Sequence, residues 1–251
     1  MCRHVAHLGP PLALRDVLTV PPHSLLRQSW APRRQRHGTV NADGFGVGWY
    51  AEGDPTPARY RRPGPVWADL SFADLVRVVR SGTFLAAVRD ATEPGADGEA
   101  AAAPFAAGPW LFSHNGAVTG WPRALAPLAA TLPAVDLLDL QARCDAALLW
   151  ALVLRRLRDG DPPGEALAET VRAVAEAAPG SRLNFLLTDG RSIAATAWGD
   201  TLWYLTGPDG RTTVASEPYD DDPRWREAPD RTLLTATRTD VLLTPLKEPC
   251  T

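Results

Sequence analysis

The order of the secondary-structure patterns restricts the fold of this chain more than any other feature. Strand patterns come first, one helical block follows, and strand patterns return near the end. Short apolar or alternating runs between Gly and Pro signals predict strands at 3–8, 45–51, 83–88, 110–114, 182–188, 192–198, 201–206 and 212–216, with one or two more in 232–243. Strands on both sides of a helical block predict an α+β fold in which two sheets pack together with helices outside.

Apolar residues recur at helical spacing inside this block and at two earlier places, and Gly or Pro signals stop the helices of the block. The predicted helices are 24–28, 71–79, 121–130, 145–158 and 163–178.

Local signals refine four further places. The Gly-Pro-Pro run at 9–11 is expected to close the first strand, and 51–65 to form a Pro-punctuated hairpin. At the start of the second helix, Ser71 is available as the N-cap, with Asp74 three residues on. The segment 93–108 is rich in Ala, Gly and Pro without periodicity, which predicts a mobile surface loop.

The composition excludes several classes of protein. The chain has 251 residues, of which 45% are hydrophobic, enough for one large domain over 1–251 with a sizeable core. Its net charge of −3 gives no case for binding nucleic acid or an anionic membrane. The 3 cysteines are odd in number and far apart, so neither a disulfide framework nor a metal site is predicted. The N-terminus has no apolar signal region and no stretch could span a bilayer, which predicts a cytoplasmic protein.

The dipeptide Met1-Cys2 carries the first chemical signal. Removal of Met1 would expose an α-amino group on the residue that also holds the thiol. A free α-amine has a pKa of roughly 7.7–8.0, so at neutral pH part of it is unprotonated and can accept the thiol proton. Cys2 would then supply both nucleophile and base. A small residue at the start of a strand explains the same position without chemistry.

Four downstream segments give Cys2 a context, although each also has a structural explanation. The segments are 41–50 (NADGFGVGWY), 88–92 (VRDAT), 112–116 (FSHNG) and 144–145 (CD). Glycines in a strand often mark a bulge, and Asn-Gly is a common turn dipeptide. Asp145 is a plausible helix N-cap, and Arg89 could be a solvated strand end.

Taken together, these segments resemble class II glutamine amidotransferases, an N-terminal nucleophile family with a four-layer αββα fold. The run 28–50 resembles the signature of one subgroup, the hydrolases of γ-glutamyl hercynylcysteine sulfoxide in ergothioneine biosynthesis. The resemblance continues through 113–116 (SHNG), 186–190 (LLTDG) and 215–218 (ASEP).

The resemblance implies a role for each matching residue. Cys2 would attack the γ-carbonyl of a glutamyl amide and form a thioester, with Asn115 and the Gly116 N–H holding the oxyanion. Arg89 would pair with the α-carboxylate of the glutamyl group, assisted by Thr92, and Asp145 would hold the α-ammonium group. The resemblance also implies a small-molecule substrate and no cofactor.

Several positions depart from the family pattern or stay open. Ala146 follows Asp145 where relatives often carry Ser or Thr, and Asp90 stands where they often carry an aromatic or small residue. Asp43, Gly44 and His114 are interpreted as architectural. Ser216 and Glu217 could line the pocket or form a sheet-edge turn.

The leaving half of such a substrate carries a quaternary ammonium group, which aromatic faces recognise. Trp30, beside the arginines at 33, 34 and 36, is therefore predicted to bind it; the alternative is a tryptophan that plugs the edge of the sheet sandwich. A glutaminase subunit that supplies ammonia to a separate synthase is the alternative function, although the chain after its core strands leaves no room for a synthase domain. A non-catalytic binding protein and a bile-salt type acylase are less consistent with the motifs.

Overall fold

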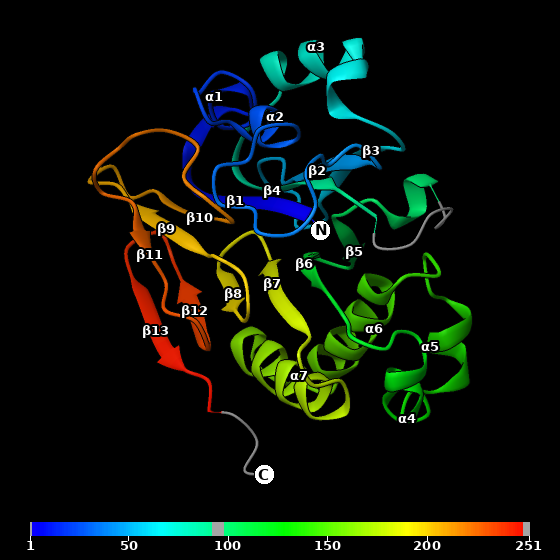
Figure 1. The fold of residues 1–251 in the computed structure, drawn as a ribbon. Coiled ribbons are helices and arrows are strands. Elements are labelled where there is room, and N and C mark those ends of the chain that lie inside the picture. Colours follow the sequence, from blue (N-terminus) through cyan, green and yellow to red (C-terminus); the bar gives the residue numbers. More distant parts are fainter. Residues whose placement is uncertain (1, 92–97, 248–251) are drawn as a thin grey trace.

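The computed structural model describes residues 2–91 and 98–247, and it forms two stacked antiparallel sheets (Figure 1). The first sheet has 7 strands in the order β11-β9-β10-β1-β4-β2-β3. Its strands are β1 (Cys2–Ala13), β2 (Phe45–Trp49), β3 (Ala58–Arg62), β4 (Arg80–Arg89), β9 (Trp203–Thr206), β10 (Thr212–Ala215) and β11 (Arg226–Glu227). The N-terminal strand therefore lies in the middle of the sheet, between β10 and β4.

The second sheet has 6 strands in the order β13-β12-β8-β7-β6-β5. These are β5 (Phe105–Ala107), β6 (Trp110–Ala117), β7 (Arg182–Thr188), β8 (Ile193–Ala197), β12 (Thr232–Ala236) and β13 (Val241–Pro245). The predicted strands at 182–188 and 192–198 pair across the turn at Asp189 and Gly190, as their turn signal indicates.

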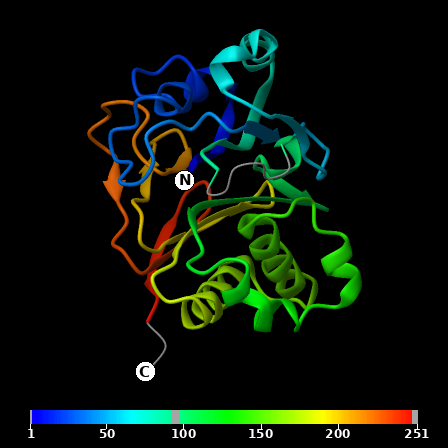
Figure 2. The same cartoon turned by 45° about the vertical axis from the view of Figure 1, so that its right-hand side comes forward.

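Helices cover the outer face of each sheet, so the molecule has four αββα layers, as predicted (Figures 1 and 2). On the first sheet lie α1 (Arg15–Leu18), α2 (Leu25–Gln28) and α3 (Leu70–Val78); on the side of the second lie α4 (Ala126–Ala129), α5 (Ala134–Leu138), α6 (Asp145–Arg158) and α7 (Pro163–Ala177). Short 3₁₀ turns occur at Val66–Ala68, Gly98–Ala101 and Arg123–Leu125. None of the helices in the described ranges is long and apolar enough to cross a membrane.

Three hydrophobic cores hold these layers together: one under α1–α3, one between the two sheets, and one under α6 and α7. The alternation of side chains along β1 shows which core each face of the strand contacts. Val5 packs in the core under α1–α3, whereas Ala6 and Leu8 pack between the sheets. Because side chains alternate along a strand, Cys2 and His4 also face the second sheet.

Two predicted boundaries are wrong, and the structure shows why. The Gly-Pro-Pro run does not end the first strand: β1 continues to Ala13, and a register shift between Leu8 and Leu12 absorbs the run. Helix α3 begins at Leu70, and its N-cap is Asp69, whose carboxylate accepts hydrogen bonds from Ser71 N and Phe72 N. Asp69 outcompetes the predicted cap Ser71 because a carboxylate can accept both N–H groups.

The prediction of a surface loop over 93–108 is also wrong where the structure describes it; residues 92–97 lie outside the described ranges. The remainder contains a 3₁₀ turn and strand β5, and Phe105 is completely buried. Its alanines lack the bulk that reveals a buried segment in sequence, yet Ala101–Ala103 are buried at the edge of the second sheet. The predicted helix at 121–130 is shorter, consisting of a 3₁₀ turn followed by α4.

Candidate active site

Strand register places the two most chemically informative residues side by side. Cys2 on β1 is directly opposite Arg89 on β4 in the antiparallel ladder. Residues opposite each other in such a ladder present their side chains on the same face. Cys2 and Arg89 therefore project from the same end of the first sheet, toward the second sheet.

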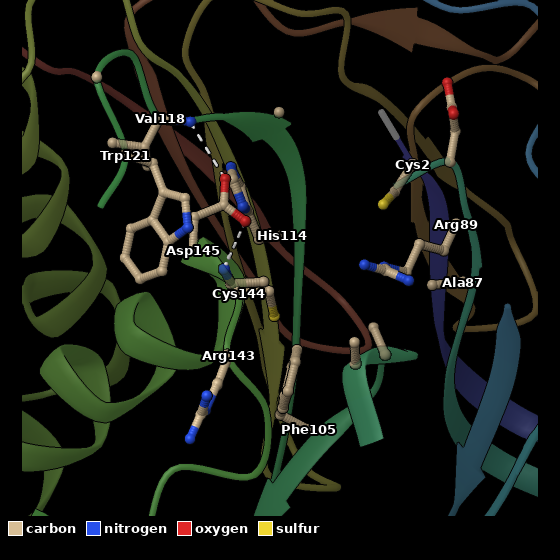
Figure 3. A pocket seen from close by; sticks show the side chains of 16 residues that line it. Cys2, Ala87, Arg89, Phe105, His114, Val118, Trp121, Arg143, Cys144 and Asp145 are labelled. Carbon is tan, nitrogen blue, oxygen red and sulfur yellow. Dashed lines mark hydrogen bonds between the residues drawn. The ribbon is translucent and has the colours of Figure 1, made fainter. Parts of the chain in front are cut away.

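Between the sheets at this end lies a cavity of about 150 Å³. Figure 3 shows Cys2, Arg89 and Ala87 on one wall, and Asp145 and Trp121 on the opposite wall. The remaining lining residues are Asp90, Ala101, Ala103, Phe105, His114, Gly116, Val118, Gly120, Arg143, Cys144 and Ala146. Thus β1, β4, β6 and the N-terminus of α6, which are far apart in sequence, converge on one cavity.

Asn115 on β6 contacts the nucleophile candidate directly. Its Oδ1 accepts a hydrogen bond of 3.1 Å from Cys2 N, whereas its buried Nδ2 has no acceptor within the described residues. The next residue, Gly116, lines the cavity, and a Cβ there would collide with the main-chain oxygen of Arg182. Only glycine fits at this position, and Asn115 keeps an amide donor for a ligand.

Arg89 and Asp145 bring opposite charges to the cavity. The Arg89 Nη1 donates to the main-chain oxygen of Asp43 at 3.2 Å, and no carboxylate in the described ranges forms an ion pair with it. Asp145 is the first residue of α6; its carboxylate accepts from Ala146 N at 2.8 Å and from Val118 N at 3.2 Å. The N-cap of α6 is Cys144, so the capping explanation for Asp145 is wrong, and the Asp145 carboxylate lines the cavity.

Burial raises the pKa of both thiols at the site. Burial raises the pKa of the Cys2 thiol, while the positive charge of Arg89 and the main-chain N–H of Asp90 act in the opposite direction. Burial raises the pKa of Cys144 to about 11. Cys144 is therefore protonated at neutral pH, and Cys2 needs a base to become a thiolate.

His114 also lines the cavity, and burial lowers the pKa of its imidazole, which is therefore neutral. Its Nε2 lies 3.0 Å from the main-chain oxygen of Arg182. Because a carbonyl oxygen can only accept, Nε2 carries the proton. This bond supports the architectural interpretation of His114, although its ring also forms part of the cavity wall.

Of the predicted site residues, Cys2, Arg89, Gly116 and Asp145 line one cavity, and Asn115 contacts Cys2. Thr92 lies outside the described residues. The lining residues that the structure describes do not include Trp30. Its ring is 38% exposed, meets the Trp67 ring edge-on at 5.6 Å and has the Arg27 guanidinium 5.4 Å from its centroid. The assignment of Trp30 to the leaving group stays a prediction.

Sequence reasoning missed how the basic loop is held. Glu217 is completely buried, and its two carboxylate oxygens accept from Arg33 N at 2.9 Å and Arg34 N at 2.8 Å. Glu217 therefore holds the loop by its main chain, rather than lining the described part of the cavity. No local pattern could reveal this contact, because it joins residues 183 and 184 positions apart.

Comparison with known proteins shows the family of this chain. The model of the class II glutamine amidotransferases matches residues 22–220. A γ-glutamyl-hercynylcysteine sulfoxide hydrolase of Mycolicibacterium smegmatis is 44% identical, over 98% of this chain and 100% of the relative. A protein of the same name from Mycobacterium tuberculosis is 42% identical, over 98% of this chain and 97% of the relative. The solved structure of a glutamine aminotransferase class-II domain protein from Silicibacter pomeroyi superposes with a TM-score of 0.71 at 25% identity, covering 98% of this chain and 100% of that one. This chain belongs to the class II glutamine amidotransferase family.

Proposed function

We propose that this protein hydrolyses the γ-glutamyl amide bond of γ-glutamyl hercynylcysteine sulfoxide, releasing glutamate and hercynylcysteine sulfoxide. The observation that carries the proposal is a single cavity lined by the Cys2 thiol, the Arg89 guanidinium and the Asp145 carboxylate. A nucleophile flanked by one positive and one negative side chain suits an amide whose acyl half carries a free α-carboxylate and a free α-ammonium group. Relatives that are 42% and 44% identical over 98% of the chain carry the name of this hydrolase.

In the proposed reaction, the Cys2 α-amine, freed by loss of Met1, takes the thiol proton. The thiolate Sγ attacks the γ-carbonyl carbon, and the C–N bond breaks as the amine returns the proton to the leaving nitrogen. Water then cleaves the thioester to give glutamate. In both steps the negative oxygen would lie against Asn115 Nδ2, a buried donor without an acceptor in the described residues, and against the N–H of Gly116, which lines the cavity.

Arg89 and Asp145 would bind the α-carboxylate and α-ammonium groups of the glutamyl half. A guanidinium can donate two parallel hydrogen bonds to the α-carboxylate, and its charge is not compensated by a described carboxylate. The Asp145 carboxylate on the opposite wall suits the α-ammonium group (Figure 3). Thr92 would assist with the α-carboxylate and Trp30 with the leaving half. A cytoplasmic location suits a reaction on a small thiol-derived metabolite.

Product analysis with competing substrates tests the assignment. The mature enzyme receives γ-glutamyl hercynylcysteine sulfoxide, glutamine and a plain γ-glutamyl dipeptide together, and each product is followed by mass spectrometry. We expect the sulfoxide substrate to be consumed first. Preferential release of ammonia from glutamine would instead favour the glutaminase subunit.

The nucleophile is tested by Cys2→Ala, with Cys2 retained behind an uncleavable N-terminal extension as a second variant. Both should lose turnover, the first because no thiol remains and the second because the amine becomes an amide. Intact-protein mass spectrometry of the wild type should show the glutamyl thioester, and circular dichroism should show that both variants are folded. Turnover by Cys2→Ala within a few-fold of wild type would exclude the thioester mechanism.

A further inference from the structure

Asp43, in the turn before β2, holds the segment that carries Arg89. Its main-chain N donates to Arg89 O at 2.9 Å, and its main-chain O accepts from Arg89 Nη1 at 3.2 Å. Its carboxylate Oδ2 accepts from Ala91 N at 2.8 Å. The neighbouring Gly44 O accepts from Arg89 N at 2.8 Å. Asp43 and Gly44 therefore hold both ends of the segment 89–91, as well as the guanidinium of Arg89.

The choice of partner atoms matters for the charge of Arg89. The guanidinium is oriented by a neutral carbonyl, while the nearby Asp43 carboxylate is directed at the N–H of Ala91. Arg89 is thus held in place without losing its charge to an ion pair, and most of its five donors stay available to a ligand carboxylate. An ion pair between Asp43 and Arg89 would have oriented the side chain equally well but neutralised it.

The same segment, 89–91, also contacts the region of the Cys2 thiol. Between Arg89 and Ala91 stands Asp90, which lines the cavity and whose main-chain N–H faces the Cys2 thiol. The Asp90 side chain in turn lies against Gly38, where a Cβ would meet Asp90 Oδ2. A displacement of the segment 89–91 would therefore move the Arg89 guanidinium relative to the Cys2 thiol.

We infer that Asp43 is a positioning residue for the glutamyl head group, acting through the segment 89–91 at the end of β4 to aim Arg89 at the α-carboxylate. The inference rests on the proposed function for the identity of the ligand that Arg89 binds. It makes specific the architectural role that the sequence indicates for Asp43. Its side chain is exposed, so its removal leaves no cavity in the core.

The first test compares Asp43→Ala with Asp43→Asn. The alanine variant loses the acceptor for Ala91 N, and we expect KM for γ-glutamyl hercynylcysteine sulfoxide to rise about tenfold with kcat within threefold. The asparagine variant keeps an Oδ1 acceptor and should restore KM to within about threefold of wild type. Asp54→Ala is the matched control: the exposed Asp54 also accepts a main-chain hydrogen bond, from Thr56 N at 2.8 Å, but lies outside the described cavity lining.

A double-mutant cycle with Arg89→Ala then asks whether Asp43 acts through Arg89. In the Arg89→Ala background, Asp43→Ala should change kcat/KM less than twofold, because the group it positions is gone. A γ-amide substrate without the α-carboxylate should likewise be indifferent to Asp43→Ala. Equal losses in both backgrounds and on both substrates would overturn the inference and show a general structural role.

Binding of L-glutamate by isothermal titration separates this inference from the proposed reaction. Weaker glutamate binding by Asp43→Ala, with no further loss in Arg89→Ala, supports the positioning role even if the wild type fails to cleave the sulfoxide substrate. Turnover of that substrate by the wild type, with glutamate affinity and KM unchanged in Asp43→Ala, would leave the proposed function intact and exclude the inference.

Discussion

At the scale of single residues, the two ends of the Asn115 amide have different surroundings. Its Oδ1 holds the main-chain nitrogen of Cys2, and its buried Nδ2 has no acceptor in the described part of the chain. A buried donor without a partner is unfavourable unless a ligand satisfies it. A negative oxygen formed beside Cys2 would do so during each half of the reaction.

We expect Asn115→Ala to lower kcat by about 100- to 1,000-fold, with a much smaller change in KM, because the lost donor acts on the transition state. Asn115→Asp keeps an acceptor for Cys2 N but loses the donor, so its kcat should fall at least as far. Steady-state kinetics on the mature enzyme measures both. Near-normal turnover by the aspartate variant would assign Asn115 to holding Cys2 alone.

The sequence predicted the residues of the site better than their contacts. Cys2, Arg89, Asn115, Gly116 and Asp145 stand within recognisable local runs. The contacts from Asp43 to Arg89 and Ala91 join residues 46 and 48 positions apart, and they depend on the pairing of β2 with β4. A short run of sequence shows which residue types are present, whereas the register of strand pairing decides which residues come into contact.

At the scale of elements, the loop 30–41 shows how a segment without helix or strand is held beside the site. Side-chain hydrogen bonds hold it in place of strand pairing: the buried Glu217 accepts from two successive N–H groups, and the half-buried Gln35 accepts through Oε1 from Arg3 Nε at 3.1 Å and Asn41 Nδ2 at 3.0 Å. Arg3 is completely buried in β1, and burial lowers the pKa of its guanidinium, an effect that the charge of Glu217 opposes. The loop is thus anchored by buried polar groups.

Glu217→Gln should lower the free energy of unfolding by about 1–3 kcal/mol, because one carboxylate oxygen becomes an amide donor facing an N–H. Amide hydrogen exchange at Arg33 and Arg34 should become faster than in the wild type. Chemical denaturation measures the first effect and exchange mass spectrometry the second. Glu52→Gln, at an exposed position, is the matched control. Unchanged exchange in the loop would show that its anchor lies elsewhere.

Element boundaries were predicted well where apolar periodicity is strong and poorly where it is weak. The helix 145–158 and the strand 182–188 have the bounds expected for them. The segment around Ala101–Ala103 was misjudged, because small side chains fit a tight site beside β2 without showing a pattern. The carbonyl of Ala103 in fact lies close enough to Gly46 to exclude a Cβ there.

At the scale of the whole molecule, the central position of β1 buries two histidines. Between β10 and β4, His4 and His7 are both fully inaccessible to solvent. His4 Nδ1 lies 3.1 Å from Ser113 Oγ of the second sheet, and His7 Nδ1 lies 3.2 Å from Thr213 Oγ1 of β10. Burial lowers the pKa of His4 to about 3 and that of His7 to about 4. Both imidazoles are therefore neutral in the folded protein.

These depressed pKa values make the stability of the sandwich depend on pH. In the unfolded chain histidine takes up a proton below about pH 6.5, whereas the folded state resists protonation down to pH 3–4. Acid therefore favours the unfolded state, and each histidine should lower the free energy of unfolding by about 2 kcal/mol between pH 7.5 and pH 5.

Urea denaturation followed by circular dichroism at these two pH values measures the loss, and His7→Gln should remove about half of it. His7 is the better site for this substitution because it lies outside the described lining of the Cys2 cavity. The matched control is His37→Gln, at an exposed position. A wild-type stability that is the same at both pH values would mean that the imidazoles are not held neutral.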